Sequence, residues 1–388
     1  METQPRVVIV GGGFAALEAA FTLRQHLGER VDVTLVADRP ELVFKPDTIH
    51  VPFGGAEDDL RLPLAQPTER RGIALRQGSI AKVDTDPKRI ALEDGAVLDY
   101  DYLVLATGAA MLPDEIPGLA QHARLIWTID QMRELGDALH RLRDAAVDGS
   151  PQHVLFLVPP GNMWAGPLYE LAFMLETWLR RNRVRDLICV TFATCEGSYL
   201  QAFGEGLHHT ITKEFTGKGI IGRTGAAATA VEPTRVRFAD GTAHTFDLLV
   251  AAAPYGAAVH YTGLPTDERG FLLTDAETRR VQGTDAVYAP GDAGDFPVKQ
   301  AFLAFLQADA VADDIAARID PEAVRHPRRF DDRLVGAAPV WRLGKKALGA
   351  YLPHRFRAGL PFHDGLPWEA MALGLKDKSK ALAGTVKE

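Results

Sequence analysis

The sequence VVIVGGGFAALE at residues 7–18 joins an apolar strand, a glycine turn and a helix, and it constrains the fold more than any other feature. In the pattern G-x-G-x-x-G/A, Gly11 permits the tight turn, Gly13 lets the backbone approach a pyrophosphate, and Ala16 allows close helix–strand packing. Free N–H groups at the helix start then face the phosphates. A second strand at residues 31–36 is followed by Asp38, close to where an acid holds a ribose hydroxyl. These features predict a dinucleotide-binding βαβ unit.

Composition limits the class of protein. A chain of 388 residues, with 46% hydrophobic and 24% charged residues, has the size of two or more domains and the composition of a soluble globular protein. A net charge of −8 argues against a nucleic-acid binder. We find no signal peptide at the start of the sequence and no run of apolar residues long enough to span a membrane. We therefore expect a cytoplasmic protein, with attachment to the inner face of the membrane as the alternative.

The cysteine and histidine spacings give no local redox pair and no metal site. Cys189 and Cys195 are six residues apart on an extended segment, roughly 20 Å, which is too far for a disulfide. Cys189 is interpreted as an inert core thiol, and Cys195 as a thiol at a strand end that has no neighbouring cation to lower its pKa. His208 and His209 are adjacent on a predicted helix, so they point in different directions.

Alternating strand and helix patterns predict an α/β fold with two Rossmann-like three-layer domains and a C-terminal extension. The FAD-type domain is expected at residues 1–112 and 268–322, the second Rossmann-like domain at 113–267, and the extension at 323–388. One strand ends at Ala106-Thr107-Gly108, where small residues let a ligand lie against the backbone. A late short strand leads to Gly291-Asp292, after which a helix is predicted from 296 to about 318. The other expected segments are strands at 75–84, 89–92, 102–106, 153–158 and 187–192, and helices at 129–146 and 167–181.

The second βαβ unit departs from the dinucleotide pattern at its turn. The sequence there is Pro159-Pro160-Gly161-Asn162-Met163-Trp164 instead of G-x-G-x-x-G. Proline removes a backbone donor, and tryptophan is too large for the point where helix and strand should touch. The sequence therefore argues against bound NAD(P)H, without excluding it.

With these motifs in order, residues 5 to about 320 resemble the two-dinucleotide-domain flavoproteins, which include disulfide reductases, type II NADH dehydrogenases and sulfide:quinone oxidoreductases. The resemblance implies non-covalent FAD. It places Gly11, Gly13 and residues Phe14, Ala15 and Ala16 at the pyrophosphate, Asp38 at the adenosine ribose, the Ile80 backbone at the adenine, and Asp292 at the ribityl chain. Lys299 and Gln300 would lie at the pyrimidine edge of the flavin. The other cofactor-binding candidates are Arg39, Lys45, Ala106, Thr107, Gly108 and Gly291.

Within this group the chain resembles most the sulfide:quinone oxidoreductase and flavocytochrome c sulfide dehydrogenase branch. The resemblance rests on the run from Gly166 to Phe173, on Ala253-Pro254-Tyr255, and on the run from Phe296 to Gln300. Members of that branch place a redox cysteine just before the first run, where this chain has Trp164. Sulfide oxidation through a persulfide needs a thiolate and a resolving partner, so we do not expect this activity.

Trp164 and Lys299 are the candidate catalytic residues. Trp164 either shapes the site over the flavin or packs between domains, and the alternative for Lys299 is a solvated surface lysine. The leading hypothesis is an FAD-dependent oxidoreductase that passes electrons from a small-molecule reductant, without a cysteine relay, to a quinone or another acceptor. The alternatives are an NAD(P)H dehydrogenase and a non-catalytic flavin redox sensor.

The C-terminal extension has its own composition. Residues 325–357 contain nine Lys and Arg against two acids, a local charge of +7. Apolar and aromatic residues, Trp341 and Tyr351 among them, are interleaved with these cations and continue to Trp368. This composition is typical of segments that lie on an anionic membrane surface. The alternative is docking on the acidic body of the same chain, or on the partner in a homodimer.

Overall fold

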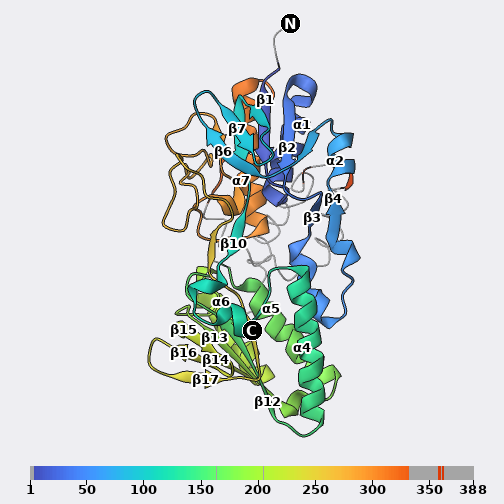
Figure 1. Cartoon of the computed structure of the whole chain (residues 1–388), viewed down its shortest axis with the longest axis vertical. Helices are drawn as coiled ribbons and strands as arrows, with labels where there is room; N and C mark the ends of the chain where they lie inside the picture. Colours follow the sequence, from blue (N-terminus) through green and yellow to red (C-terminus); the bar gives the residue numbers. More distant parts are fainter. Residues whose placement is uncertain (1–3, 163, 204, 332–356, 360, 362–388) are drawn as a thin grey trace, which may run out of the picture. The chain divides into compact units, whose positions relative to one another are not determined.

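The computed structural model of the chain describes residues 4–162, 164–203, 205–331, 357–359 and 361. Two compact units make up the chain. The first comprises Met1–Leu42, Leu62–Gly108 and Val259–Glu388, and the second comprises Val43–Arg61 and Ala109–Ala258. A five-stranded sheet forms the centre of each unit. Figure 1 labels β1 and β2 of the first sheet and β12, β13 and β14 of the second.

The first unit is built on a parallel sheet with the strand order β20-β9-β1-β2-β5. Residues 7–10 of the first strand are all buried, which is typical of a parallel strand covered on both faces. The strand pairs with β2 from Arg6↔Asp32 to Val10↔Val36. The bounds are β1 (Arg6–Val10), β2 (Asp32–Ala37), β5 (Ala74–Gln77), β9 (Tyr102–Leu105) and β20 (Val287–Tyr288).

Helices α1 (Phe14–Leu27) and α7 (Ala301–Ile319) pack against each other in this unit. Their close approach depends on small residues. A Cβ at Gly291 would lie 3.0 Å from the Cβ of Ala15 and 3.2 Å from that of Ala304. The unit also contains helix α2 (Ala65–Arg70), the 3-10 turns η1 (Gly28–Arg30) and η7 (Gly291–Ala293), and an antiparallel sheet of β6 (Ile80–Asp84), β7 (Arg89–Leu92) and β8 (Val97–Asp99).

Two predicted elements of this unit need correction. The single strand expected at 75–84 is two strands in different sheets, because the chain leaves the parallel sheet at Gly78, whose N–H donates to the Ala37 carbonyl. The helix expected from residue 296 begins at Ala301. Pro297 disfavours helical backbone at the preceding residue, and Gln300 is still extended, with φ −143° and ψ 136°.

The second unit is built on a parallel sheet in the order β11-β18-β12-β13-β14. Its strands are β11 (Arg124–Leu125), β12 (Gln152–Val158), β13 (Ile188–Thr194), β14 (Ile220–Arg223) and β18 (Leu248–Ala251). The stretch before β18 contains an antiparallel sheet that the sequence pattern did not separate, formed by β15 (Ala228–Glu232), β16 (Arg235–Phe238) and β17 (Ala243–Thr245). The main helices are α4 (Ile129–Val147), α5 (Gly166–Arg181) and α6 (Glu205–Lys218).

The remaining short elements complete the chain trace. Strands β10 (Ala109–Met111) and β19 (Tyr255–Ala257) form an antiparallel pair, and β3 (Glu41–Val43) pairs with β4 (Arg61–Pro63). The short helical turns are η2 (Lys45–Phe53), η3 (Asp58–Leu60), η4 (Pro113–Glu115), α3 (Leu119–His122), η5 (Arg185–Leu187) and η6 (Gln201–Phe203).

These units divide the chain differently from the boundaries expected from the sequence. Residues 43–61 and 109–112 belong to the second unit, and residues 259–267 belong to the first. The stretch at 43–61 joins the second unit because Ile49 and Val51 are buried in its core with Met132 and Leu135 of α4. A Cβ at Gly136 of α4 would lie 3.2 Å from the Pro52 backbone, so the contact is close.

The described start of the C-terminal extension is tied to acidic residues of α7. Arg328 Nη2 donates to Asp313 Oδ1 at 2.7 Å, and its Nη1 lies 2.8 Å from Asp309 Oδ2. His26 Nε2 of α1 lies 2.9 Å from the same Asp313 oxygen. Burial alone would raise the pKa of Asp313, but the hydrogen bonds from Arg328 and His26 hold it well below its usual range. The first residues of the extension thus dock on the acidic body of the chain, while residues 332–356 lie outside the described part.

We expect Arg328→Ala to lower the free energy of unfolding by about 1–3 kcal/mol near neutral pH, because it leaves two buried carboxylates without their cation. The lowered pKa of Asp313 gives stability above its unfolded pKa, about 3.9, and this stability is lost as the pH falls through the folded pKa. The difference between wild type and variant should therefore narrow below pH about 4. Urea unfolding across pH measures it, with Arg325→Ala, an exposed Arg325–Glu322 pair, as the control. Equal losses in both variants would contradict the prediction.

Candidate functional site

The carboxyl edge of the first parallel sheet collects most of the residues predicted to bind a cofactor. All five strands run in the same direction, so the residues that follow them meet at one edge. Ligands of open α/β sheets bind in the crevice outside this edge. The residues that follow β1, β2, β9 and β20 there are Gly11 to Ala16, Asp38 and Arg39, Ala106 to Gly108, and Gly291 with Asp292.

The glycine turn has the geometry that a pyrophosphate needs. Gly11 has φ +127°, and a Cβ there would lie 2.2 Å from the Ala106 carbonyl oxygen, so the position accepts only glycine. Gly13 precedes α1 with an ordinary φ of −92°, and a Cβ there would meet nothing within 4 Å. Glycine is therefore dispensable for packing at position 13 and leaves space at the helix N-terminus. This space fits the close approach of a phosphate group.

Two further hydrogen bonds hold the strand ends of this edge. Thr107 Oγ1 lies 3.0 Å from the hydroxyl oxygen of Tyr261, and burial raises the pKa of that tyrosine. The Gly291 N–H donates to Gln307 Oε1 at 2.9 Å in a buried position. Tyr261 and Gln307 were missed by the sequence analysis. A polar residue on the apolar helix 301–319 was a usable signal for Gln307, whereas the sequence around Tyr261 has no recognisable pattern.

Lys299 is a buried cation, not the solvated surface lysine that was the alternative. Its side chain is 4% exposed; Nζ donates to the Gly294 carbonyl at 2.5 Å and lies 3.6 Å from the centre of the Phe271 ring. Burial lowers its pKa to about 8, against the opposing effects of Asp292 and Asp267. A largely charged ammonium at neutral pH in a dry setting can stabilise negative charge that forms beside it.

Gln300 provides a test of whether this region fits a flavin. The residue is 8% exposed, and its Oε1 is buried with no hydrogen-bond partner among the described residues. A buried amide without a partner costs free energy unless a ligand supplies one. The pyrimidine edge of a flavin carries both donors and acceptors. The orphaned amide next to Lys299 therefore fits the predicted cofactor.

The structure places the other predicted residues as follows. Asp38 and Arg39 are exposed and their side chains lie 3.3 Å apart. Ile80 is buried at the start of β6 and borders a small cavity of about 80 Å³ together with Val259 and Tyr261. Lys45 belongs to the second unit, where its Nζ lies 3.5 Å from the centre of the Trp127 ring.

A buried ion pair near Lys299 was also missed. Arg279 is 3% exposed and has φ +56°, a left-handed conformation that is uncommon outside glycine. Its Nη2 donates to Asp295 Oδ1 at 2.9 Å, and Thr274 Oγ1 donates to the same oxygen at 2.6 Å. These bonds fix the loop that leads to Lys299.

In the second unit, the turn after β12 is closed by its own side chains. Asn162 Nδ2 donates to the Ala253 carbonyl at 2.8 Å, and its Oδ1 accepts from the Trp164 N–H at 3.1 Å. The indole of Trp164 lies against Gly166, the first residue of α5, where a Cβ would come within 2.4 Å of the ring. The indole thus covers the helix start that a second pyrophosphate would need.

The acid after β13 is engaged as well. Glu196 stands where a dinucleotide site has its ribose-binding acid. Its Oε2 accepts from the Tyr169 hydroxyl at 2.7 Å and from Thr194 Oγ1 at 2.8 Å, and its Oε1 accepts from the Gln201 N–H at 3.1 Å. The carboxylate is used for internal structure.

The two cysteines differ from each other in a way that corrects one prediction. Cys189 is exposed at the start of β13, so it is not a core thiol. The apolar neighbours in sequence do not cover it because the strand begins at a surface pocket. Cys195 is half-buried, and burial, with the nearby Glu196, raises the pKa of its thiol to about 11.

We expect a thiol reagent at pH 8 to label Cys189 at least about tenfold faster than Cys195, because the thiolate is the reactive form. The difference in reactivity should disappear in denaturant. Labelling kinetics with an aromatic disulfide measure a fast phase from Cys189 and a slow phase from Cys195. The variant Cys189→Ser should lack the fast phase. Fast labelling of two thiols in the native protein would contradict the prediction.

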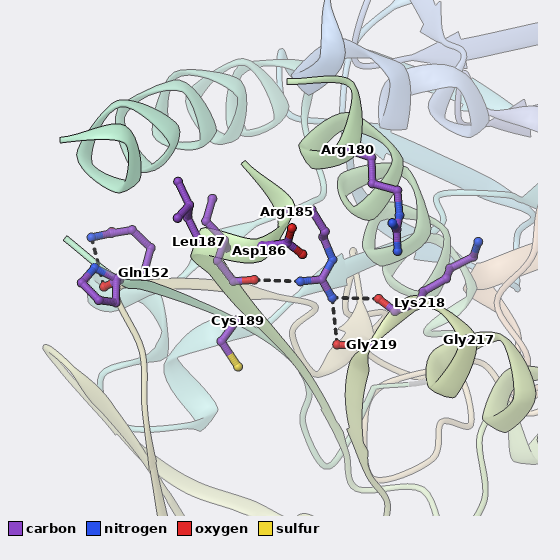
Figure 2. Close-up of a pocket in the computed structure, with 11 residues that line it drawn as sticks. Gln152, Arg180, Arg185, Asp186, Leu187, Cys189, Gly217, Lys218 and Gly219 are labelled. Atoms are coloured by element: carbon purple, nitrogen blue, oxygen red, sulfur yellow. Dashed lines mark hydrogen bonds between the residues drawn. The ribbon is translucent and has the colours of Figure 1, made fainter. Parts of the chain in front are cut away.

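The pocket beside Cys189 lies away from the carboxyl edges of the sheet. It has a volume of about 540 Å³ and is bordered by the starts of β12 and β13 and by the end of α6. Figure 2 shows Arg185 in its wall, donating to the carbonyl groups of Ile188, Lys218 and Gly219. Because these are the amino ends of parallel strands, the pocket is not the nucleotide crevice.

Two points limit other sites. Among the residues that the structure describes, no helix is both long and apolar enough to cross a membrane. No group of three or more His, Cys, Asp or Glu side chains converges to hold a metal ion in that part of the chain.

The two units and their parallel sheets define a class of fold: a two-domain, Rossmann-type fold. The profile of the family described as "Pyridine nucleotide-disulphide oxidoreductase" matches residues 5–153. The predicted resemblance to this group of proteins is thereby confirmed for residues 5–153.

Similar proteins support the same conclusion. The chain is 28% identical over 247 residues to a sulfide-quinone reductase of Aquifex aeolicus. This match covers 62% of the chain and 56% of that protein. The match thus spans little more than half of this relative. A "NADH dehydrogenase-like protein" of Mycobacterium tuberculosis is 27% identical over 297 residues, covering 74% of the chain and 72% of the relative. The crystal structure of the sulfide:quinone oxidoreductase from Aquifex aeolicus matches with a TM-score of 0.80 at 20% identity and covers 93% of each chain. This likeness confirms the predicted fold class.

The comparisons do not support the expectation that bound NAD(P)H is unlikely. One of the relatives above is named for NADH. The degenerate turn of the second unit therefore argues against NAD(P)H as the electron donor, whereas the name of this relative favours it.

Proposed function

We propose that the protein is an FAD-dependent oxidoreductase that passes electrons from a small reductant to a quinone, without a cysteine relay. The observation that carries this proposal is the joint placement of the glycine turn and three further strand ends at one sheet edge, with Gly13 leaving space for a phosphate. A sulfide-quinone reductase among the relatives supports quinone as the acceptor.

When bound, FAD supplies the two-electron chemistry. The chain's own residues hold and tune it. The turn at Gly11 and Gly13 binds the pyrophosphate, and the Gln300 amide pairs with the pyrimidine edge. The Lys299 ammonium stabilises negative charge at that edge. Residues 38–50 contain no cysteine that could attach the flavin covalently, which supports non-covalent binding.

The absence of a thiol relay separates this proposal from sulfide oxidation. Trp164 occupies the position of the redox cysteine, and neither Cys189 nor Cys195 lies next to it in sequence. We therefore propose a reductant that reacts directly with the flavin. Micromolar sulfide that bleaches the flavin rapidly and supports quinone turnover would contradict this part.

A second candidate function is NAD(P)H dehydrogenation, which the relative named for NADH favours. The closed turn at Asn162 and Trp164 and the engaged Glu196 carboxylate weigh against it. An anaerobic titration of the purified yellow protein with NADH, NADPH, sulfide and small thiols in turn separates the candidates. Bleaching by a nicotinamide supports the second candidate, and bleaching by another reductant supports the first. A flavin that no donor reduces would indicate a redox sensor.

The C-terminal extension is proposed to meet the quinone at a membrane surface. Its basic and aromatic composition carries this step, since most of the segment lies outside the described residues. Unchanged cosedimentation with anionic vesicles after deletion of residues 332–388 would contradict it. The deletion keeps Arg328 and Arg329, which hold the start of the extension to α7.

A further inference from the structure

Two histidines of the second unit face each other near the amino end of β12, the central strand of its parallel sheet. His153 is the second residue of β12, and His244 is the middle residue of β17. Their Nε2 atoms are 3.3 Å apart, and the ring centres are 4.8 Å apart. Thr191 Oγ1 of β13 lies 2.9 Å from His153 Nε2. Two polar atoms thus approach His153 Nε2.

Hydrogen bonds alone cannot satisfy both contacts of His153 Nε2 well. A lone pair on His153 Nε2 can accept one good hydrogen bond, yet both Thr191 Oγ1 and His244 Nε2 approach it. If His153 Nε2 carries the proton instead, it has one hydrogen to share between two acceptors. One of the two contacts is therefore left weak in either tautomer.

The separation of the two nitrogens fits a shared metal ion. Zinc binds imidazole nitrogen at about 2.0–2.1 Å in tetrahedral geometry, which puts two such nitrogens about 3.3–3.4 Å apart. The observed 3.3 Å agrees with this value without movement of the backbone. Imidazole is a ligand that Zn²⁺, Cu²⁺ and Ni²⁺ accept.

Backbone hydrogen bonds hold His153 in place, and its surroundings shift the pKa of both rings. The His153 N–H donates to Asp247 Oδ2 at 2.8 Å, and the Asp247 N–H donates to the His153 carbonyl at 2.9 Å, so the backbone of His153 is fixed. Burial lowers the pKa of both histidines. The neighbouring His244 lowers that of His153 further, and Arg223 lowers that of His244. Asp247 opposes these effects at His153, and Arg223 is itself paired with Asp240.

We propose that His153 and His244 form a binding site for one divalent transition-metal ion of the zinc type, with the Thr191 hydroxyl and water completing the coordination. The site has two strong protein ligands, in agreement with the lack of any three-residue His, Cys, Asp or Glu group in the described chain. It is therefore an exchangeable site. It lies at the start of β12, in the second unit, whereas the candidate cofactor residues follow strands of the first unit.

The test is a calorimetric titration of the untagged, flavin-loaded protein with Zn²⁺ alone, for wild type, His153→Gln, His244→Gln and the control His209→Gln. His209 is an exposed histidine on α6. We expect one Zn²⁺ per chain in wild type and in the control, and a loss of affinity of at least about tenfold in each of the other two variants. No binding to wild type, or equal affinity in all four proteins, would overturn the proposal.

A measurement on wild type alone covers the case in which a variant does not fold. Diethylpyrocarbonate modifies neutral histidines, and peptide mapping locates the modified residues. Zn²⁺ should protect His153 and His244 while leaving His209 reactive. Equal modification of His153 and His244 with and without Zn²⁺ would overturn the proposal.

Discussion

Replacing Gly13 with alanine is expected to release the flavin while the chain stays folded. A Cβ at this position meets no protein atom within 4 Å, and the φ of −92° suits alanine. The cost to the fold is the loss of a glycine N-cap, about 1 kcal/mol or less. A methyl group at the helix start, however, occupies the space that the pyrophosphate needs. We expect flavin content to fall at least about tenfold, measured by the ratio of visible to ultraviolet absorbance after purification.

Gly11→Ala is the matched comparison, because its Cβ would lie 2.2 Å from the Ala106 carbonyl oxygen in a backbone with φ +127°. Strain and overpacking together should destabilise the fold by roughly 3 kcal/mol or more. Gly95→Ala, in a hairpin turn with φ +86° and open space, should cost only about 1–3 kcal/mol in strain and leave flavin content unchanged. If Gly13→Ala retains full flavin content, the turn is not the pyrophosphate site.

Lys299→Met is expected to make the bound flavin harder to reduce. A buried ammonium that stabilises the reduced, negatively charged cofactor contributes about 1.5–3 kcal/mol, as hydrogen bonds to charged groups do. For a two-electron couple, 1.4 kcal/mol corresponds to about 30 mV, so the midpoint potential should fall by about 30–60 mV. Spectroscopic redox titration measures the shift.

The pH dependence separates this role from a structural one. The pKa of Lys299 is lowered to about 8, so its charge is present below that pH and lost above it. The potential of wild type should therefore show an additional alkaline break that Lys299→Met lacks. Lys82→Met, which removes an exposed lysine, is the control. Identical potentials and pH profiles for all three proteins would contradict the prediction.

The parts of the fold that depend on local pattern could be predicted from the sequence. The glycine turn and the wholly apolar strand at 7–10 predict a parallel sheet, because a strand covered on both faces is apolar throughout. The departure from the G-x-G-x-x-G pattern at Pro159 to Trp164 could also be recognised locally, since proline and tryptophan do not fit that pattern. The predicted cofactor residues of the first unit depend on strand ends, and parallel strands bring those ends together.

Features that depend on which residues tertiary packing buries or leaves exposed could not be predicted. Cys189 sits among apolar residues in sequence, yet the start of its strand borders a surface pocket. The contacts that bury Lys299 were not predictable, because only the folded chain brings Phe271 and Gly294 against it. The His153–His244 contact joins residues 91 positions apart from two different sheets, and no spacing rule signals it.

The division of the chain into two units has a consequence for its synthesis. The edge strand β20 and the helix α7, which covers α1, come after the whole of the second unit in the chain. When the ribosome has released residues 43–258, the second unit has all of its parts, while the first still has α1 exposed, with Glu18 and its apolar neighbours uncovered. We infer that the N-terminal unit completes its folding last, so that flavin is bound only after residues near 319 have emerged.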